Sequence, residues 1–147
     1  MLGYWDRDAE TEAALAGDVL HTGDLGFLEP TGDLVLRGRR KELILRGGAN
    51  VHPSEVERVL QADPAVAASA VLGVPDERLG ERVVAAVELA PGGDLDVAGL
   101  RRRCRDALAR YKVPDEIVAV DSLPRNAMNK VVKAELRPLF IEGRKES

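Results

Sequence analysis

The spacing of apolar residues changes several times along the chain, and the changes mark the expected elements. Within residues 19–37, apolar and polar positions alternate around Leu25 and Phe27 and again at Leu34 and Leu36, on either side of the turn sequence at residues 30–33, Pro-Thr-Gly-Asp. Proline and glycine supply the backbone geometry of such a turn. This stretch predicts a β-hairpin, and the acidic stretch at residues 6–16 before it predicts a short helix or loop.

From about residue 41 the pattern predicts strands and helices in alternation. The strands are expected at residues 43–46, 66–74, 82–89 and 117–120, and the helices from Pro53 to Asp63-Pro64, over 96–111, and after the loop 122–129. The order is strand, helix, strand, strand, helix, strand, helix. It predicts an α+β fold in which a three-stranded sheet is covered by helices, preceded by the β-hairpin segment.

Residues 96–111 have the clearest helical periodicity. Their apolar positions recur at spacings of three and four: Val97, Leu100, Cys104, Leu108 and Tyr111. Pro114 is expected to end this helix. Cys104 lies on the apolar face, so we expect it in the core and not as a nucleophile. In the last helix we expect Val132, Leu136 and either Leu139 or Phe140 to point inward.

Composition limits the classes of function. The 147 residues are 45% apolar and 31% charged, which is typical of a globular chain, and the net charge of -4 gives no broad basic field for nucleic acid. One cysteine excludes an intrachain disulfide and a multi-cysteine metal site, so no metal ligands are assigned. It also fits a reducing, cytoplasmic location. The N-terminus does not read as a signal peptide, and no membrane span is expected because the apolar runs are too short.

Two His residues, one Cys and scattered carboxylates form no self-contained nucleophile and base. Any chemistry would therefore use groups that this chain does not contain. Three motifs remain as candidates. Asp24, next to glycines in His21-Thr22-Gly23-Asp24-Leu25-Gly26, can present a carboxylate to two adjacent hydroxyls, such as those of a ribose. Taken alone, the spacing favours the other interpretation, a turn aspartate that bonds its own backbone.

The second motif runs from Gly38-Arg39-Arg40-Lys41 to Gly47-Gly48 and on to Pro53. A glycine pair before a helix lets a ligand approach the backbone, and a helix N-terminus favours anions. The third motif is Leu123-Pro124-Arg125-Asn126-Ala127-Met128-Asn129-Lys130, whose lysine can extend from a loop as a mobile positive charge. Alone, the two are typical of an ordinary strand–turn–helix and of a surface lysine.

Together and in this order, the three motifs resemble the adenylate-forming enzymes, a family of acyl-CoA synthetases, nonribosomal peptide synthetase adenylation domains and firefly luciferase. The resemblance covers Gly3 to about Arg137 and is closest to acyl-CoA synthetases. Its most specific part is HTGDLGFLEPTGDLVLRGRRKELILRGGANVHPSEVE at residues 21–57. Supporting segments are AVLGVPDERLGERVVAAVEL at 70–89 and YKVP at 111–114.

The resemblance implies an activity in two steps. A carboxylic acid reacts with Mg-ATP to give an acyl-adenylate, and the acyl group then passes to the thiol of CoA. Residues 1–40 would be the tail of a large N-terminal AMP-binding domain, and residues 41–147 the mobile C-terminal domain. ATP, magnesium and the acyl group would be bound mainly by the large domain. The chain would then be a fragment that is inactive alone and whose partners are the carboxylic acid, ATP, CoA and that domain.

The resemblance also implies roles for single residues. Asp24 matches the ribose-binding aspartate and Arg39 the arginine near the ribose and phosphate. Lys41 matches the hinge, and Gly47 and Gly48 match the loop that approaches the pantetheine channel. Lys130 matches the lysine between the substrate carboxylate and the α-phosphate.

Asn129 departs from the family pattern, which has glycine before this lysine. Asparagine tolerates a positive φ better than most residues, so we expect the loop to keep its shape.

Two alternatives stay open. The chain could be a free-standing docking module that regulates a partner synthetase, although such a module would not need Asp24, Arg39, Gly48 and Lys130. The acceptor could also be the phosphopantetheine of a carrier protein in place of CoA. The arginines from Arg101 to Arg105 could meet CoA phosphates or form a solvated helix face, and the second reading is the expectation.

Overall fold

The computed structural model describes residues 2–17 and 19–141. The chain forms two compact units, residues 1–41 and residues 42–147. None of the helices in the described ranges is long and apolar enough to cross a membrane.

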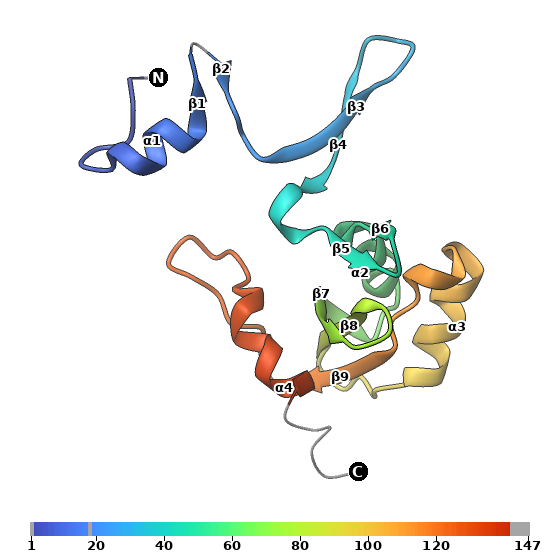
Figure 1. The fold of residues 1–147 in the computed structure, drawn as a ribbon. Helices are drawn as coiled ribbons and strands as arrows, with labels where there is room; N and C mark the ends of the chain where they lie inside the picture. The colour runs from blue at the N-terminus through green and yellow to red at the C-terminus, as the bar shows by residue number, and fades with distance from the viewer. Residues whose placement is uncertain (1, 18, 142–147) are drawn as a thin grey trace. The chain divides into compact units, whose positions relative to one another are not determined.

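The first unit contains the predicted hairpin (Figure 1). Helix α1 (Asp8–Ala14) leads into the short strands β1 (Leu15–Ala16) and β2 (Val19–Leu20), which pair antiparallel. Strands β3 (Asp24–Leu28) and β4 (Leu34–Arg39) then pair antiparallel on either side of the predicted turn. The Glu29 amide closes this turn by donating to the Asp33 carbonyl at 2.9 Å.

The second unit is built on the predicted three-stranded sheet. Strand β7 (Val66–Asp76) pairs antiparallel with β8 (Gly80–Leu89), and β9 (Glu116–Val120) pairs with β8 in parallel. A short hairpin, β5 (Ile44–Arg46) and β6 (Ala49–Val51), extends the sheet to five strands through the pairing of Arg46 with Gly80. The sequence predicts β5 from the apolar residues Leu43, Ile44 and Leu45 but not β6, where Ala49-Asn50-Val51 contains a single branched apolar residue.

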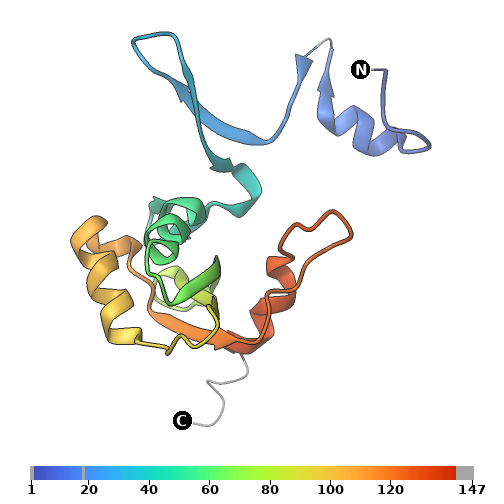
Figure 2. The same ribbon diagram turned by 180° about the vertical axis from the view of Figure 1, so that it is seen from behind.

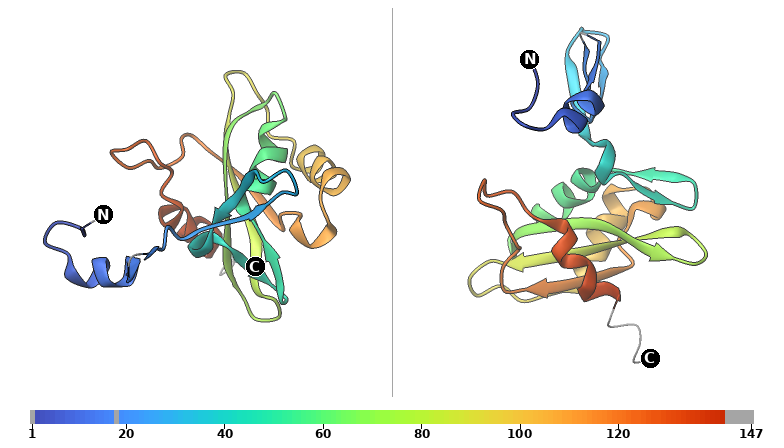
Figure 3. Two further views of the ribbon diagram at one scale, coloured as in Figure 1. Left: turned by 90° about the horizontal axis from the view of Figure 1, so that it is seen from above. Right: turned by 60° about the vertical axis from the view of Figure 1, so that its left-hand side comes forward.

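Helices cover both faces of this sheet (Figures 2 and 3). Helices α2 (Pro53–Gln61) and α3 (Val97–Ala107) pack on one face. On the other face lie the 3₁₀ turn η3 (Lys133–Leu136) and helix α4 (Arg137–Ile141). The fold is therefore the small α+β domain that the pattern predicts.

Alternation along β8 divides the apolar residues between two cores. Val83, Ala85 and Val87 point into the core under α2 and α3. Val84 and Ala86 belong to the opposite core, with residues of the C-terminal segment such as Leu136 and Phe140. Because successive strand residues face opposite sides, one strand of apolar residues can serve both layers.

Helix α3 ends at Ala107, four residues before the predicted end at Tyr111. Leu108 leaves the helix with φ -129° and ψ 156°, and residues 110–112 form a separate 3₁₀ turn, η2 (Arg110–Lys112). Leu108 instead packs against the core, whereas the Tyr111 side chain is exposed. Tertiary packing of Leu108 therefore ends the helix before Pro114 can.

The remaining core predictions agree with the structure at particular positions. Pro53 stands in the first turn of α2, and the helix stops before Asp63. Cys104 is fully buried among apolar side chains. In the C-terminal segment Leu136 and Phe140 are buried, whereas Leu139 is half exposed. Of the two residues predicted as alternatives, Phe140 is thus the inward one.

Candidate functional site

Lys130 lies on an exposed loop between β9 and η3. The backbone of this loop is ordered by an isolated β-bridge between Arg125 and Val131. In the described part of the chain the Lys130 side chain has no hydrogen-bond or ion-pair partner. The loop therefore presents an ammonium group whose three donors are not used by residues 2–17 and 19–141.

Asn126 organises the Lys130 loop, a role that the sequence analysis missed. Its Oδ1 accepts hydrogen bonds from the amides of Met128 (3.0 Å) and Lys130 (2.9 Å). Its own amide donates to the Lys130 carbonyl at 2.9 Å. An asparagine that bonds backbone amides two to four residues later is a known turn signal, so the Pro-Arg-Asn sequence could have indicated it.

Asn129 adopts a left-handed conformation with φ 61°. This agrees with the expectation that asparagine keeps the loop shape in place of glycine. The Asn129 carbonyl also accepts from the Arg125 guanidinium at 3.1 Å. Asn129 therefore has a left-handed backbone conformation, and its carbonyl is fixed by the hydrogen bond from Arg125.

Lys133 ties the segment after the loop to the rest of the second unit. Its Nζ lies 2.8 Å from Glu57 Oε1 and 3.0 Å from Glu42 Oε2. Glu57 stands in α2, and its Oε1 also accepts the Val71 amide of β7 at 2.9 Å. Three residues after Lys130, the chain is thus fixed to a helix, a strand and the residue that follows Lys41.

Gly47 and Gly48 form the two-residue turn of the β5–β6 hairpin. Their φ angles are 56° and 82°, which only glycine adopts without strain in both positions. The pair precedes helix α2, as expected, with the short strand β6 between them. A Cβ on Gly48 would meet nothing within 4 Å, so one side of the turn is open.

The sheet holds one end of this turn. The Gly47 amide donates to the Leu79 carbonyl at 2.7 Å, and Arg46 pairs with Gly80 at the start of β8. The Lys130 loop begins at the other end of β8, where the Leu123 amide donates to Glu88 at 3.1 Å. The two motifs therefore leave the sheet from opposite ends of one strand.

Asp24 and Arg39 face each other across the β3–β4 hairpin of the first unit. Arg39 Nε lies 2.8 Å from Asp24 Oδ1, and Arg39 Nη1 donates to the Thr22 carbonyl at 3.3 Å. Both side chains remain partly exposed, at 54% for Arg39 and 30% for Asp24. The structure thus brings together the two residues expected near the nucleotide.

Lys41 lies in the 3₁₀ turn η1 (Arg40–Glu42), at the last residue of the first unit. Its side chain is exposed. A short turn with few backbone bonds is the kind of segment that can absorb a change of φ and ψ.

The arginines of α3 do not act as one cluster. Arg101 donates to the carbonyls of Pro114 and Asp115, and Arg103 pairs with Asp63 at 3.2 Å. Arg101 and Arg105 also line an open cavity of about 640 Å³. The expectation of a plain solvated face therefore holds for only part of the row.

Burial raises the pKa of the Cys104 thiol, against the opposing charge of Arg103. The thiolate is the reactive form, so this cysteine is poorly suited to be a nucleophile. Among residues 2–17 and 19–141 there is also no group of three His, Cys, Asp or Glu residues that could hold a metal ion.

Comparison with known proteins shows which family this chain belongs to. The AMP-binding enzyme C-terminal domain matches residues 55–130. The chain belongs to this family. Among its curated relatives, the 2-succinylbenzoate–CoA ligase of Geobacillus kaustophilus is 46% identical over 138 residues. The match covers 94% of this chain and 28% of the ligase. The 3-[(3aS,4S,7aS)-7a-methyl-1,5-dioxo-octahydro-1H-inden-4-yl]propanoyl:CoA ligase of Mycobacterium tuberculosis is also 46% identical, covering 95% of the chain and 28% of the ligase.

Solved structures agree with this family assignment. The o-succinylbenzoate CoA synthetase of Bacillus subtilis, in complex with its acyl-adenylate intermediate, matches with a TM-score of 0.87 and 38% identity over 92% of the chain. The amide bond synthetase McbA of Marinactinospora thermotolerans matches with a TM-score of 0.86 and 40% identity over 94%. In both comparisons this chain spans only 28% of the length of the relative.

Proposed function

We propose that this chain is the C-terminal part of an acyl-CoA synthetase, which joins a carboxylic acid to CoA through an acyl-adenylate. The observation that carries the proposal is the Lys130 loop, an ordered segment that presents an uncommitted ammonium group. Relatives named as CoA ligases, matched over more than nine tenths of the chain, support the same reaction class.

Lys130 would act in the adenylation step. Attack of a carboxylate on the α-phosphate brings two anions together, and a lysine between them offsets their repulsion. The ordered backbone supports this role because an electrostatic group is most effective when it is positioned before the reaction. Loss of one such group typically lowers the rate on the order of 10²–10³-fold.

The Gly47-Gly48 turn would act in the thioester step. Neither glycine has a Cβ, so the thiol-bearing arm of CoA could pass close to the backbone of the turn. Arg105 and Arg110 line the same cavity as Arg46 and supply positive charge that suits the phosphates of CoA.

Asp24 and Arg39 would contact the ribose and the phosphate side of the nucleotide. Residues 1–40 would belong to a large AMP-binding domain and residues 41–147 to a domain that turns about Lys41. ATP and magnesium would be bound mainly by the large domain. We place the enzyme in the cytoplasm and in the metabolism of carboxylic acids such as fatty acids.

The test joins residues 1–147 to the large domain of the Bacillus subtilis synthetase and measures the two half-reactions separately. Lys130→Ala should reduce adenylation on the order of 10²–10³-fold and largely spare thioester formation from supplied acyl-adenylate. Arg137→Ala, which removes an exposed cation of α4, is the control for charge. Adenylation that survives Lys130→Ala would overturn the role given to this lysine.

A second acceptor is favoured by one observation. McbA, named an amide bond synthetase, is as similar to this chain as the CoA synthetase is. An amine acceptor would share the adenylation step and dispense with the thiol. Supplying the fusion protein with acyl-adenylate and either CoA, a phosphopantetheinyl carrier protein or an amine would show which acceptor is used.

A further inference from the structure

The Gly47-Gly48 turn needs more support than its own hairpin provides. Strands β5 and β6 have three residues each, and a hairpin of this size is marginal by itself. Two glycines in succession leave the turn with the greatest backbone freedom of any residue pair. The hairpin pairs with the rest of the sheet at a single position, Arg46 with Gly80.

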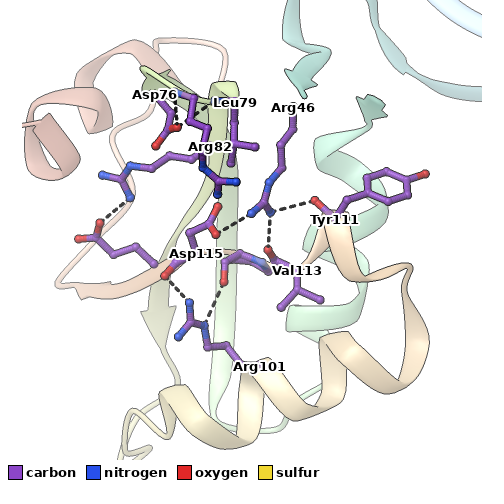
Figure 4. Close-up of polar contacts among 11 residues, drawn as sticks. Arg46, Asp76, Leu79, Arg82, Arg101, Tyr111, Val113 and Asp115 are labelled. Atoms are coloured by element: carbon purple, nitrogen blue, oxygen red, sulfur yellow. Dashed lines mark hydrogen bonds and ion pairs between the residues drawn. The ribbon is translucent and has the colours of Figure 1, made fainter. Parts of the chain in front are cut away.

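Arg46 adds to the Gly47–Leu79 hydrogen bond a second anchor of the turn, made by its side chain. The guanidinium crosses from β5 to the segment 111–115, which is 65–69 residues away in the sequence (Figure 4). Nη2 lies 2.7 Å from Asp115 Oδ1, and Nη1 donates to the carbonyls of Tyr111 (2.9 Å) and Val113 (3.2 Å). The Arg46 side chain is only 15% exposed, and its contacts with Val113 and Asp115 are partly buried.

The segment that receives Arg46 is itself fixed. Arg101 reaches it from α3 and donates to the carbonyls of Pro114 and Asp115 (Figure 4). The Asp115 amide donates to the Val83 carbonyl of β8 at 2.8 Å. Arg46 therefore connects the glycine turn to a backbone that a helix and the central strand already hold.

Only arginine can make this set of contacts. Its planar fork presents separate N–H groups to a carboxylate and to two carbonyls at once, whereas lysine offers one compact ammonium on a flexible stem. A lysine at position 46 would keep the charge and the pairing with Asp115 but lose the simultaneous contacts.

We infer that Arg46 is a positioning residue for the thioester step, because it holds the Gly47-Gly48 turn against segment 111–115. The inference rests on the proposed function of that turn. It concerns the contacts that Arg46 makes with the protein, and it requires that loss of the side chain loosens the turn while the central sheet stays intact.

The first experiment uses the 147-residue chain and measures amide hydrogen exchange by NMR in Arg46→Met and Arg46→Lys. Arg46→Met should accelerate exchange of the Gly47 amide by about tenfold or more and leave Val84 and Ala85 of β8 unchanged. Arg46→Lys should give a smaller acceleration. The control is Arg58→Met, which removes an exposed arginine of α2. Unchanged exchange at Gly47, or equal acceleration throughout the sheet, would overturn the inference.

The second experiment measures both half-reactions in the fusion protein. Arg46→Met should slow thioester formation by about tenfold and change adenylation less than twofold, with Arg46→Lys in between. An equal loss in both steps would overturn the positioning role. If Arg46→Met accelerates exchange at Gly47 but leaves the rate of thioester formation unchanged, Arg46 does anchor the turn, and the function proposed for the turn is overturned.

Discussion

The ammonium of Lys133 lies 2.8 Å from Oε1 of Glu57, and this ion pair joins the segment after the Lys130 loop to helix α2. The same ammonium lies 3.0 Å from Glu42 Oε2, but the two carboxylates differ in exposure. The side chain of Glu57 is 19% exposed and that of Glu42 is 48% exposed. Water screens the second pair more strongly than the first.

We therefore expect unequal coupling energies in two double-mutant cycles. Lys133→Met with Glu57→Gln should give a coupling of about 1 kcal/mol, and Lys133→Met with Glu42→Gln less than about 0.5 kcal/mol. Urea unfolding of the chain measures both. Equal coupling energies would show that the ion pair with Glu57 stabilises the fold no more than the ion pair with Glu42 does.

The left-handed conformation of Asn129 predicts a ranking of substitutions. Asn129→Gly should leave the free energy of unfolding nearly unchanged, whereas Asn129→Ala should lower it by about 1 kcal/mol because a Cβ is strained at this φ. Denaturant unfolding measures the difference. The same loss in both variants would mean that the asparagine side chain, and not its φ, is what the loop requires.

Asn126 should control the order of the lysine loop. Asn126→Ala removes the acceptor of two amide hydrogen bonds, so exchange of the Met128 and Lys130 amides should accelerate roughly tenfold. Asn126→Asp retains a side-chain oxygen at that place and is the matched control. If alanine and aspartate behaved alike, the hydrogen bonds of Oδ1 would not be what orders the loop.

The buried Arg82 should be important for stability. It is 6% exposed, lies 2.7 Å from Glu116 Oε2, and donates to the Phe140 carbonyl at 2.8 Å. Arg82→Met should lower the free energy of unfolding by about 2–3 kcal/mol, because it leaves a buried carbonyl of α4 without a donor. Glu116→Gln should cost less, since that side chain is 40% exposed. Chemical denaturation of the two variants measures both losses.

Cys104 offers a test of core integrity. With its thiol buried and its pKa raised, labelling by a thiol reagent at pH 8 should be at least about a hundredfold slower in the folded chain than in denaturant. Comparable rates would mean that the core under α3 opens readily.

Much of the fold follows from local patterns. Alternation predicts the β3–β4 hairpin, and the apolar run over residues 66–74 predicts β7. Proline at position 53 predicts where α2 begins. These signals lie within a few residues of one another, so a single sequence is enough to detect them.

The parts that the sequence does not predict depend on distant residues. Helix α3 ends early because Leu108 turns into the core, and the contacts of Arg46 join positions more than 60 residues apart. Asn126 is an intermediate example. Its turn signal is local in the sequence, but its hydrogen bond with the Lys130 amide forms only in the folded loop. For the candidate site residues, the sequence names the candidates and the structure shows the contacts that each of them makes.

The pairing order of the central sheet has a consequence for folding kinetics. Strands β7 and β8 pair through a short turn, whereas β9 joins β8 in parallel only after the α3 crossover has formed. Contacts between neighbouring segments form faster than contacts that close long loops. During refolding, the amides of the β7–β8 hairpin should gain protection before those of β9, and the layer that carries Lys130 should dock last.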